Sequence, residues 1–236
     1  MRPDNRACNA LRPVSITRNY TRYAEGAVLV TFGNTKVLCT ASIDEAVPSW
    51  LRGRDGGWIT AEYAMLPRSA QQRVNRDSVR RGRALEISRL IGRSLRAVTN
   101  LHALGERQII IDCDVLQADG GTRTAAITGA YVALSDAIAK LSREGIVGGT
   151  VLTSQCAAVS VGIVNGQICL DLCYEEDVDA EVDFNVIMRA DGGIVEIQGT
   201  AERRAFSRSQ LDGMLDVAEN GLKELFRIQR EVLNGE

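Results

Sequence analysis

The chain has 236 residues, of which 45% are hydrophobic and 25% charged, a composition that excludes a disordered chain and is typical of a globular protein. Its six cysteines form no Cys-x-x-Cys pair, and one histidine cannot complete a zinc site with them, so we expect reduced thiols. The net charge is −2, yet the first 100 residues are net positive and the rest net negative. Most basic residues are arginines, whose guanidinium group suits phosphate oxygens, so we expect a polyanionic partner.

The N-terminal segment lacks the apolar stretch of a secretory signal, and no apolar run in the sequence is long enough to cross a bilayer. We therefore expect a cytoplasmic protein that does not bind membranes. The length predicts one compact domain over residues 1–236.

Strand and helix patterns alternate along the chain. In the first half, alternating or apolar runs predict strands at 13–18, 27–32, 36–43, 58–66 and 107–117. Helical spacing predicts an amphipathic helix from Arg83 and a buried, Ala-rich helix over 122–141. The second half predicts strands at 156–164, 167–174, 182–190 and 193–199, and a last helix from the N-cap Ser207. The fold class is α/β (α+β): mixed sheets with hairpins packed against helices, in two similar βαβα-like halves.

The segment from Asp119 to Thr124 lies where a predicted strand is followed by a predicted helix. Gly120 and Gly121 let the backbone approach a ligand, and the first amides of a helix lack internal acceptors and favour an anion. Thr122 and Arg123 add hydroxyl and guanidinium donors. The alternative is an ordinary glycine turn with a threonine cap, but the adjacent arginine favours a site for inorganic phosphate.

An acidic run occupies residues 171–183. Its seven carboxylates are Asp171, Glu175, Glu176, Asp177, Asp179, Glu181 and Asp183. Two of them could hold Mg²⁺, which takes a few carboxylates together with water and phosphate oxygens. The alternative is a solvated acidic loop, and spacing alone favours it because most charge runs bind no metal.

Nine arginines and only two acidic residues fall within residues 68–96. Arg68, Arg73 and Arg76, here called the arginine loop, precede the predicted helix in a polar stretch, and Arg83 stands at the helix start. A cation there opposes the helix dipole, which suggests a bound anion, although most charge runs are the solvated side of a helix. The lone His102 is interpreted as a structural or surface residue, so we expect no histidine-based catalysis unless His102 itself provides it.

Longer runs resemble one family nearly end to end. They are MRP, LRPVSI, VLCTASI, GWITAEYAMLPRS, LEISRLIGRSLRA, DCDVLQADGGTRTAAITGA, AAVSVGIVNG, DFNVIM and VEIQGTAE. These runs are similar to the ribonuclease PH family, and the match is more specific than any short motif. The resemblance implies the ribonuclease PH-type fold, shared with polynucleotide phosphorylase and exosome ring subunits, and a homohexamer built as a trimer of dimers.

The resemblance also implies an activity: phosphorolytic trimming of the 3′ ends of tRNA precursors. Inorganic phosphate would be the co-substrate and nucleoside diphosphates the products, and the reverse reaction would add nucleotides. The implied catalytic residues are Arg83, Arg123, Asp177 and Asp183, the two aspartates also binding Mg²⁺. The implied phosphate-binding residues are Arg83, Gly121, Thr122 and Arg123, and the arginine loop is implied to contact RNA.

The sequence departs from the family pattern at a few places. Ala84 stands where threonine is expected, Cys173 where aspartate is common, and Arg203-Arg204 where acidic or small residues are usual. The segment between Arg76 and Arg83 is shorter than usual, which bears on the path of the RNA.

Two other functions compete with this interpretation. One is a catalytically silent, RNA-binding ring subunit, which the retained arginines and aspartates argue against, because function follows the site and not the fold. The other is a small-molecule phosphotransferase, which would need a nucleotide-binding loop of the Gly-x-x-x-x-Gly-Lys-Ser/Thr type that the sequence lacks.

Overall fold

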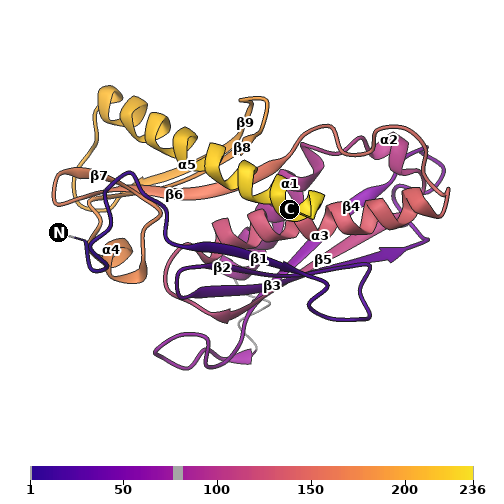
Figure 1. Cartoon of the computed structure of the whole chain (residues 1–236), viewed down its shortest axis with the longest axis horizontal. Coiled ribbons are helices and arrows are strands. Elements are labelled where there is room, and N and C mark those ends of the chain that lie inside the picture. Colours follow the sequence, from indigo (N-terminus) through magenta and orange to yellow (C-terminus); the bar gives the residue numbers. More distant parts are fainter. Residues whose placement is uncertain (1, 77–81, 236) are drawn as a thin grey trace.

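The computed structural model describes residues 2–76 and 82–235 and places their strands in two sheets (Figure 1). The five-stranded sheet has the order β1-β2-β3-β5-β4, and the four-stranded sheet has the order β7-β6-β8-β9. The strands of the first are β1 (Val14–Arg18), β2 (Gly26–Phe32), β3 (Thr35–Asp44), β4 (Trp58–Met65) and β5 (Gln108–Gln117). Those of the second are β6 (Cys156–Val164), β7 (Gln167–Leu170), β8 (Val182–Arg189) and β9 (Ile194–Ala201).

Chain connections decide how neighbouring strands pair. Strands β2 and β3 are antiparallel because Gly33 and Asn34 join them in a tight turn, with Gly33 at φ +56°. Strands β4 and β5 are parallel. Two helices lie between them in the chain, α1 (Gly82–Arg96) and α2 (Leu101–Leu104), and they provide the crossover that a parallel pair requires.

Helix α3 (Thr122–Arg143) lies against the five-stranded sheet at the centre of the molecule, and α5 (Arg208–Asn234) runs along the four-stranded sheet (Figure 1). Small residues let α3 approach the sheet closely. A Cβ at Gly129 would lie 2.6 Å from the side chain of Val30, so a larger residue there would push α3 away from the sheet. One buried hydrophobic cluster contains residues of both sheets, α1, α3 and α5.

The mixed α/β architecture with hairpins packed against helices is confirmed. The two long helices end the two halves of the chain, and the cap of α5 is the predicted Ser207, whose side chain accepts from the Gln210 amide. The strand predicted at 167–174 is shorter, because β7 ends at Leu170 and the chain then forms helix α4 (Tyr174–Asp179). Helix α2 was not predicted, since four residues are too few for a periodic signal.

Candidate active site

The turn of Asp119, Gly120 and Gly121, here called the glycine turn, joins β5 to α3. Gly120 and Gly121 have φ of +73° and +64°, a conformation that glycine adopts without strain, and Gly121 is the N-cap residue of α3. The first amides of α3 therefore begin directly after the turn and have no acceptor within the helix. The next residue, Thr122, is fixed by a 2.8 Å hydrogen bond between its hydroxyl and that of Tyr63 on β4.

Two hollows meet beside this turn. The first, a cavity of about 460 Å³, is bounded by Gly120, Gly121 and Thr122, by Arg83 of α1, by Asp177 of α4, and by the loop that follows β4. The second, of about 390 Å³, shares Arg83 and Asp177 and adds Asp183 of β8, Glu202 and Arg203. The fold thus brings together residues from α1, α3, α4 and β8 that are up to 100 positions apart in the chain.

The acidic pair, Asp177 and Asp183, has perturbed protonation. Burial and the charge of Asp177 raise the pKa of Asp183 to about 6, although the charges of Arg123 and Arg83 oppose this rise. Partial desolvation also raises the pKa of Asp177, again against the same two arginines. Perturbed carboxylates that face cations in a hollow are typical of functional sites.

Among the described residues, no group of three or more His, Cys, Asp and Glu side chains could hold a metal ion. The acidic pair alone offers two carboxylates. Two carboxylates fit Mg²⁺, which keeps several waters and takes further oxygens from substrate phosphates.

The two arginines predicted to bind phosphate have different surroundings. Arg83 is exposed in the first turn of α1, and no acidic residue lies in that turn. The Arg123 side chain is only 15% exposed. Its guanidinium donates a 2.7 Å hydrogen bond to the Gln198 side chain of β9 and lies 3.5 Å from a carboxylate oxygen of Glu86. Arg123 is therefore held by neighbours that the sequence analysis did not identify.

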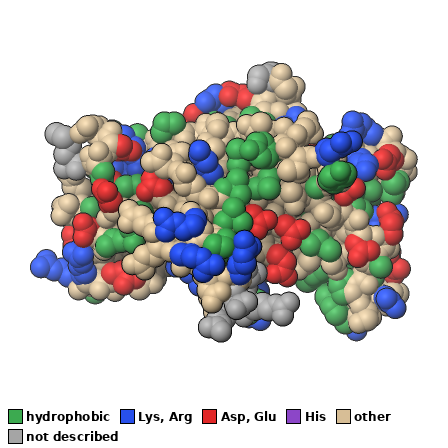
Figure 2. Space-filling model, turned by 90° about the horizontal axis from the view of Figure 1, so that it is seen from below, with side chains coloured by type: hydrophobic (Ala, Val, Ile, Leu, Met, Phe, Trp, Pro, Cys, Tyr) green, Lys and Arg blue, Asp and Glu red, His purple; other side chains and the backbone are tan. Residues whose placement is uncertain are grey.

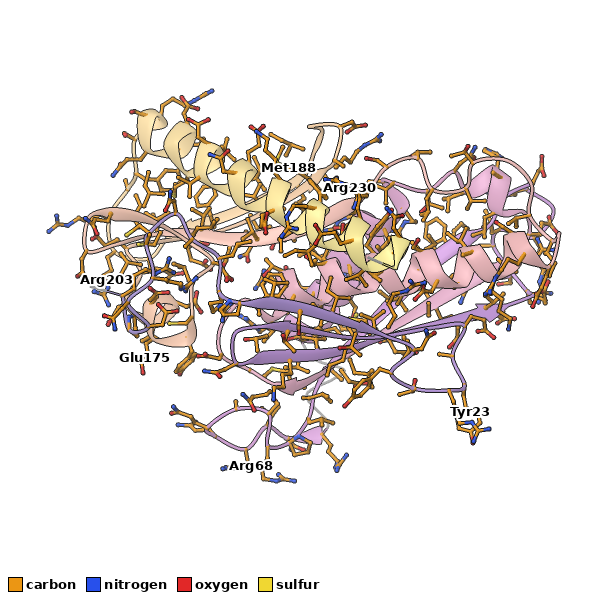
Figure 3. All side chains as sticks on the ribbon, viewed as in Figure 1. Tyr23, Arg68, Glu175, Met188, Arg203 and Arg230 are labelled. Carbon is orange, nitrogen blue, oxygen red and sulfur yellow. The ribbon has the colours of Figure 1, made fainter. Side chains whose placement is uncertain are left out.

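The arginine loop follows β4. All three of its arginines are exposed, and Arg68 donates to the backbone oxygen of Gln71. The loop projects from the body of the molecule (Figure 1), Arg68 lies on it (Figure 3), and basic side chains gather near the middle of the face seen from below (Figure 2). Gln71 and Gln72 of the same loop line the first cavity, so the arginine loop borders that cavity. The shorter segment before Arg83 falls largely on residues 77–81, outside the described residues.

The solvated acidic loop expected at 171–183 is wrong for two of its residues. Asp171 is fully buried and Glu176 is 4% exposed. They pair with three arginines of the N-terminal segment, Arg2, Arg6 and Arg12. Sequence patterns could not predict these pairs, because the partners lie about 160 or more positions apart in the chain.

The histidine and the cysteines also have a defined structural setting. His102 lies in α2, is exposed, and its Nδ1 contacts the backbone oxygen of Asp55, outside both hollows. All six cysteines are free. Cys173 is the N-cap residue of α4. Aspartate is favoured at helix N-caps, which explains why the family pattern commonly has aspartate at this position.

Comparison with known proteins identifies the family. The model for domain 1 of the 3′ exoribonuclease family matches residues 10–140, and that for domain 2 matches residues 154–221. The chain is also 57% identical to "Ribonuclease PH" of Synechococcus sp. (strain JA-3-3Ab), over 99% of this chain and 98% of the relative. This chain belongs to the ribonuclease PH family. The predicted family resemblance is thereby confirmed.

Solved structures support the fold of this family member. Rice (Oryza sativa) Rrp46 matches with a TM-score of 0.79 and 18% identity, over 98% of this chain and all of the rice chain. The Archaeoglobus fulgidus exosome with RNA bound to the active site matches with a TM-score of 0.78 and 20% identity, over 96% of this chain and 91% of that chain. Within the described residues, none of the helices has the length and apolar character needed to traverse a bilayer.

Proposed function

We propose that the protein is a phosphorolytic 3′ exoribonuclease, or tRNA nucleotidyltransferase, that trims the 3′ ends of tRNA precursors with inorganic phosphate. The observation that carries the proposal is the meeting of Arg83, Asp177 and the start of α3 around two adjoining hollows. One side of this site offers donors for an anion and the other offers two carboxylates. Transfer of a nucleotidyl group to a phosphate nucleophile needs both the anion-binding donors and the carboxylates.

Inorganic phosphate is held by Arg83, Arg123, Thr122 and the backbone of Gly121. The N-terminus of α3 favours negative charge, and guanidinium groups match phosphate oxygens two at a time. Phosphate binding has to compete with the contacts that Arg123 makes to Gln198 and Glu86. The bound phosphate then lies beside the 3′ end of the RNA in the cavity, so the reaction becomes intramolecular in effect.

In the reaction, an oxygen of the bound phosphate attacks the phosphorus of the last phosphodiester. The bond from that phosphorus to the 3′ oxygen of the preceding nucleotide breaks, and a nucleoside diphosphate leaves. The released 3′ oxygen takes a proton. The attacking hydrogen phosphate can supply it, because its oxygen loses a proton as it bonds to the phosphorus. The reverse reaction adds nucleotides from nucleoside diphosphates.

We propose Asp177 and Asp183 as the residues that hold Mg²⁺. When bound there, Mg²⁺ would neutralise charge on the transferring phosphoryl group. The two arginines and the first amides of α3 act on the same group from the other side, so most of the rate would come from positioning and electrostatic stabilisation.

The arginine loop is proposed to bind the body of the RNA, because three exposed guanidinium groups next to the cavity can contact phosphates without selecting bases. We further propose a homohexamer, arranged as a trimer of dimers, and a cytoplasmic location, which suits action on tRNA precursors. The chain is proposed to fold as a single domain over residues 1–236, since one hydrophobic cluster includes both sheets.

The test is to incubate the purified protein with 3′-extended tRNA and Mg²⁺, with and without inorganic phosphate, and to identify the released nucleotides. Nucleoside diphosphates that form only with phosphate are expected. Monophosphates formed without phosphate would mean hydrolysis and would refute the proposal. RNA binding without any release would instead support a silent, RNA-binding ring subunit.

A further inference from the structure

Arg12 is a buried arginine that contacts two separate segments of the site. Its side chain is 3% exposed. Its guanidinium forms a two-pronged pair with the carboxylate of Asp171, with nitrogen–oxygen distances of 3.0 and 2.7 Å, and its backbone amide donates to the same carboxylate. The remaining guanidinium hydrogens donate to the backbone oxygens of Asp119 and Gly120 in the glycine turn.

The glycine turn itself lies directly on the segment that leads into α4. A Cβ at Gly120 would lie 2.6 to 2.8 Å from backbone atoms of Leu172, Cys173 and Tyr174, so the two backbones are in contact. The Tyr174 amide donates to the Asp119 side chain at 3.3 Å. Asp171 begins this second segment and Asp177 lies within its helix, α4, so Arg12 links the turn before α3 to the helix that carries one of the acidic pair.

The burial of the Arg12–Asp171 pair indicates that the arginine does more than fill space. Taking a guanidinium and a carboxylate out of water costs several kcal/mol each before their attraction is counted, and an apolar pair of similar volume often serves stability as well. An apolar side chain at position 12, however, could not donate to the two carbonyl oxygens of the turn. The hydrogen bonds to the turn therefore distinguish Arg12 from a residue that only fills space.

We propose that Arg12, paired with Asp171, is a positioning residue that holds the glycine turn in register with α4. This proposal rests on the proposed role of the turn in binding phosphate. With Arg12 in place, the amides at the start of α3 and the carboxylate of Asp177 keep a fixed separation across the first cavity. Without it, the Asp119 carbonyl oxygen loses its guanidinium donor, whereas the Gly120 oxygen keeps the hydrogen bond from the Thr35 hydroxyl.

Arg12 also neutralises a charge close to the phosphate site. A Cβ at Gly121 would lie 2.9 Å from Nη2 of Arg12 and 3.8 Å from a carboxylate oxygen of Asp171, so both charges lie just behind the turn. Removing the arginine alone would leave an unpaired carboxylate there, which would repel phosphate. A test must therefore separate loss of position from gain of repulsion.

The experiment compares Arg12→Met with the double variant Arg12→Met/Asp171→Asn, which removes the unpaired charge as well. The matched control is Arg18→Lys. Arg18 pairs with the largely buried Asp136 of α3, but Asp136 is 14 residues after Thr122, about 21 Å along the helix. Steady-state kinetics with phosphate varied, thermal unfolding, and amide hydrogen exchange of residues 119–124 without phosphate are measured for each protein.

We expect the KM for phosphate to rise about 10- to 100-fold in both Arg12 variants, as for a misplaced binding group, with faster exchange of the turn amides. The control should lose stability but keep the wild-type KM and exchange. Wild-type exchange of the turn in Arg12→Met, or a wild-type KM in the double variant, would overturn the proposal. Because exchange needs no turnover, its outcome stands even if the wild-type protein shows no phosphorolysis.

Discussion

Replacing Arg123 by alanine separates catalysis from stability. The structural cost is small, because Arg123 gives up one 2.7 Å hydrogen bond to Gln198 and a 3.5 Å contact with the half-exposed Glu86. These are worth about 1 kcal/mol and at most about 1 kcal/mol, respectively. For a chain of this length, a loss of 2 kcal/mol lowers Tm by about 4 to 8 °C.

We expect a larger catalytic cost, because in the proposed reaction the guanidinium faces charge that develops on the transferring phosphoryl group. Removing one such donor costs about 2.7 to 4 kcal/mol, a 10²- to 10³-fold loss of kcat. The assay measures phosphate-dependent release of nucleoside diphosphates at 25 °C, where the variant stays folded, together with thermal unfolding.

Arg93→Ala is the matched control. Arg93 lies on α1 and contacts Glu196 of β9 at 2.9 to 3.1 Å, but unlike Arg123 it is not among the charges that affect the pKa of Asp177 or Asp183. We expect a similar small drop in Tm and activity within about twofold of wild type, as for a surface ion pair. An Arg123→Ala protein that keeps a third or more of wild-type activity would refute the assignment of Arg123 to phosphate. Equal losses in both variants would point to the β9 contacts instead.

Three further perturbations test other parts of the site. Changing all three residues of the arginine loop to alanine should weaken tRNA binding more than it slows turnover of a short oligonucleotide. It should also lower the slope of log binding constant against log salt concentration by about 2, as measured by titration at several salt concentrations. An unchanged slope would exclude phosphate contacts by these arginines. Gly120→Ala should destabilise the protein by at least about 2 kcal/mol in chemical unfolding, since the added methyl meets the backbone before α4, whereas Gly166→Ala, with similar φ and open space, should cost about 1 kcal/mol. Glu176→Gln should be about 3 kcal/mol less stable than wild type at pH 7, and this difference should shrink as pH falls below about 4.5; a constant difference from pH 7 to pH 3 would contradict the pairing.

The sign of that last effect follows from the surroundings of Glu176. Burial alone would raise its pKa, but hydrogen bonds from Arg2 and the Cys173 amide, with the charges of Arg2 and Arg6, bring the pKa below its ordinary value. A carboxylate with a lowered folded-state pKa stabilises the protein above its unfolded-state pKa. It loses that contribution as pH falls through the folded-state value. The glutamine variant has no such group to protonate, so it is less sensitive to acid.

The sequence by itself determined the elements whose signals are local. The hairpin at Gly33-Asn34, the amphipathic face of α1 and the cap at Ser207 each depend on a few neighbouring residues, and each appears where it was predicted. The family also followed from the sequence alone, because the matching runs extend over nearly the whole chain. The runs predicted the glycine turn, but they did not reveal what holds it.

Only the tertiary structure decided which members of the acidic run are structural and which face the cavity. Asp171 and Asp183 are both aspartates in one short run, but Asp171 is neutralised by an arginine 159 positions earlier, whereas Asp183 shares a hollow with Asp177. Likewise, Arg123 meets Gln198 only because β9 passes beside α3. Charge spacing cannot report such pairs, since the energy of a carboxylate depends on the dielectric and the partners around it, and these are set by segments far away in the chain.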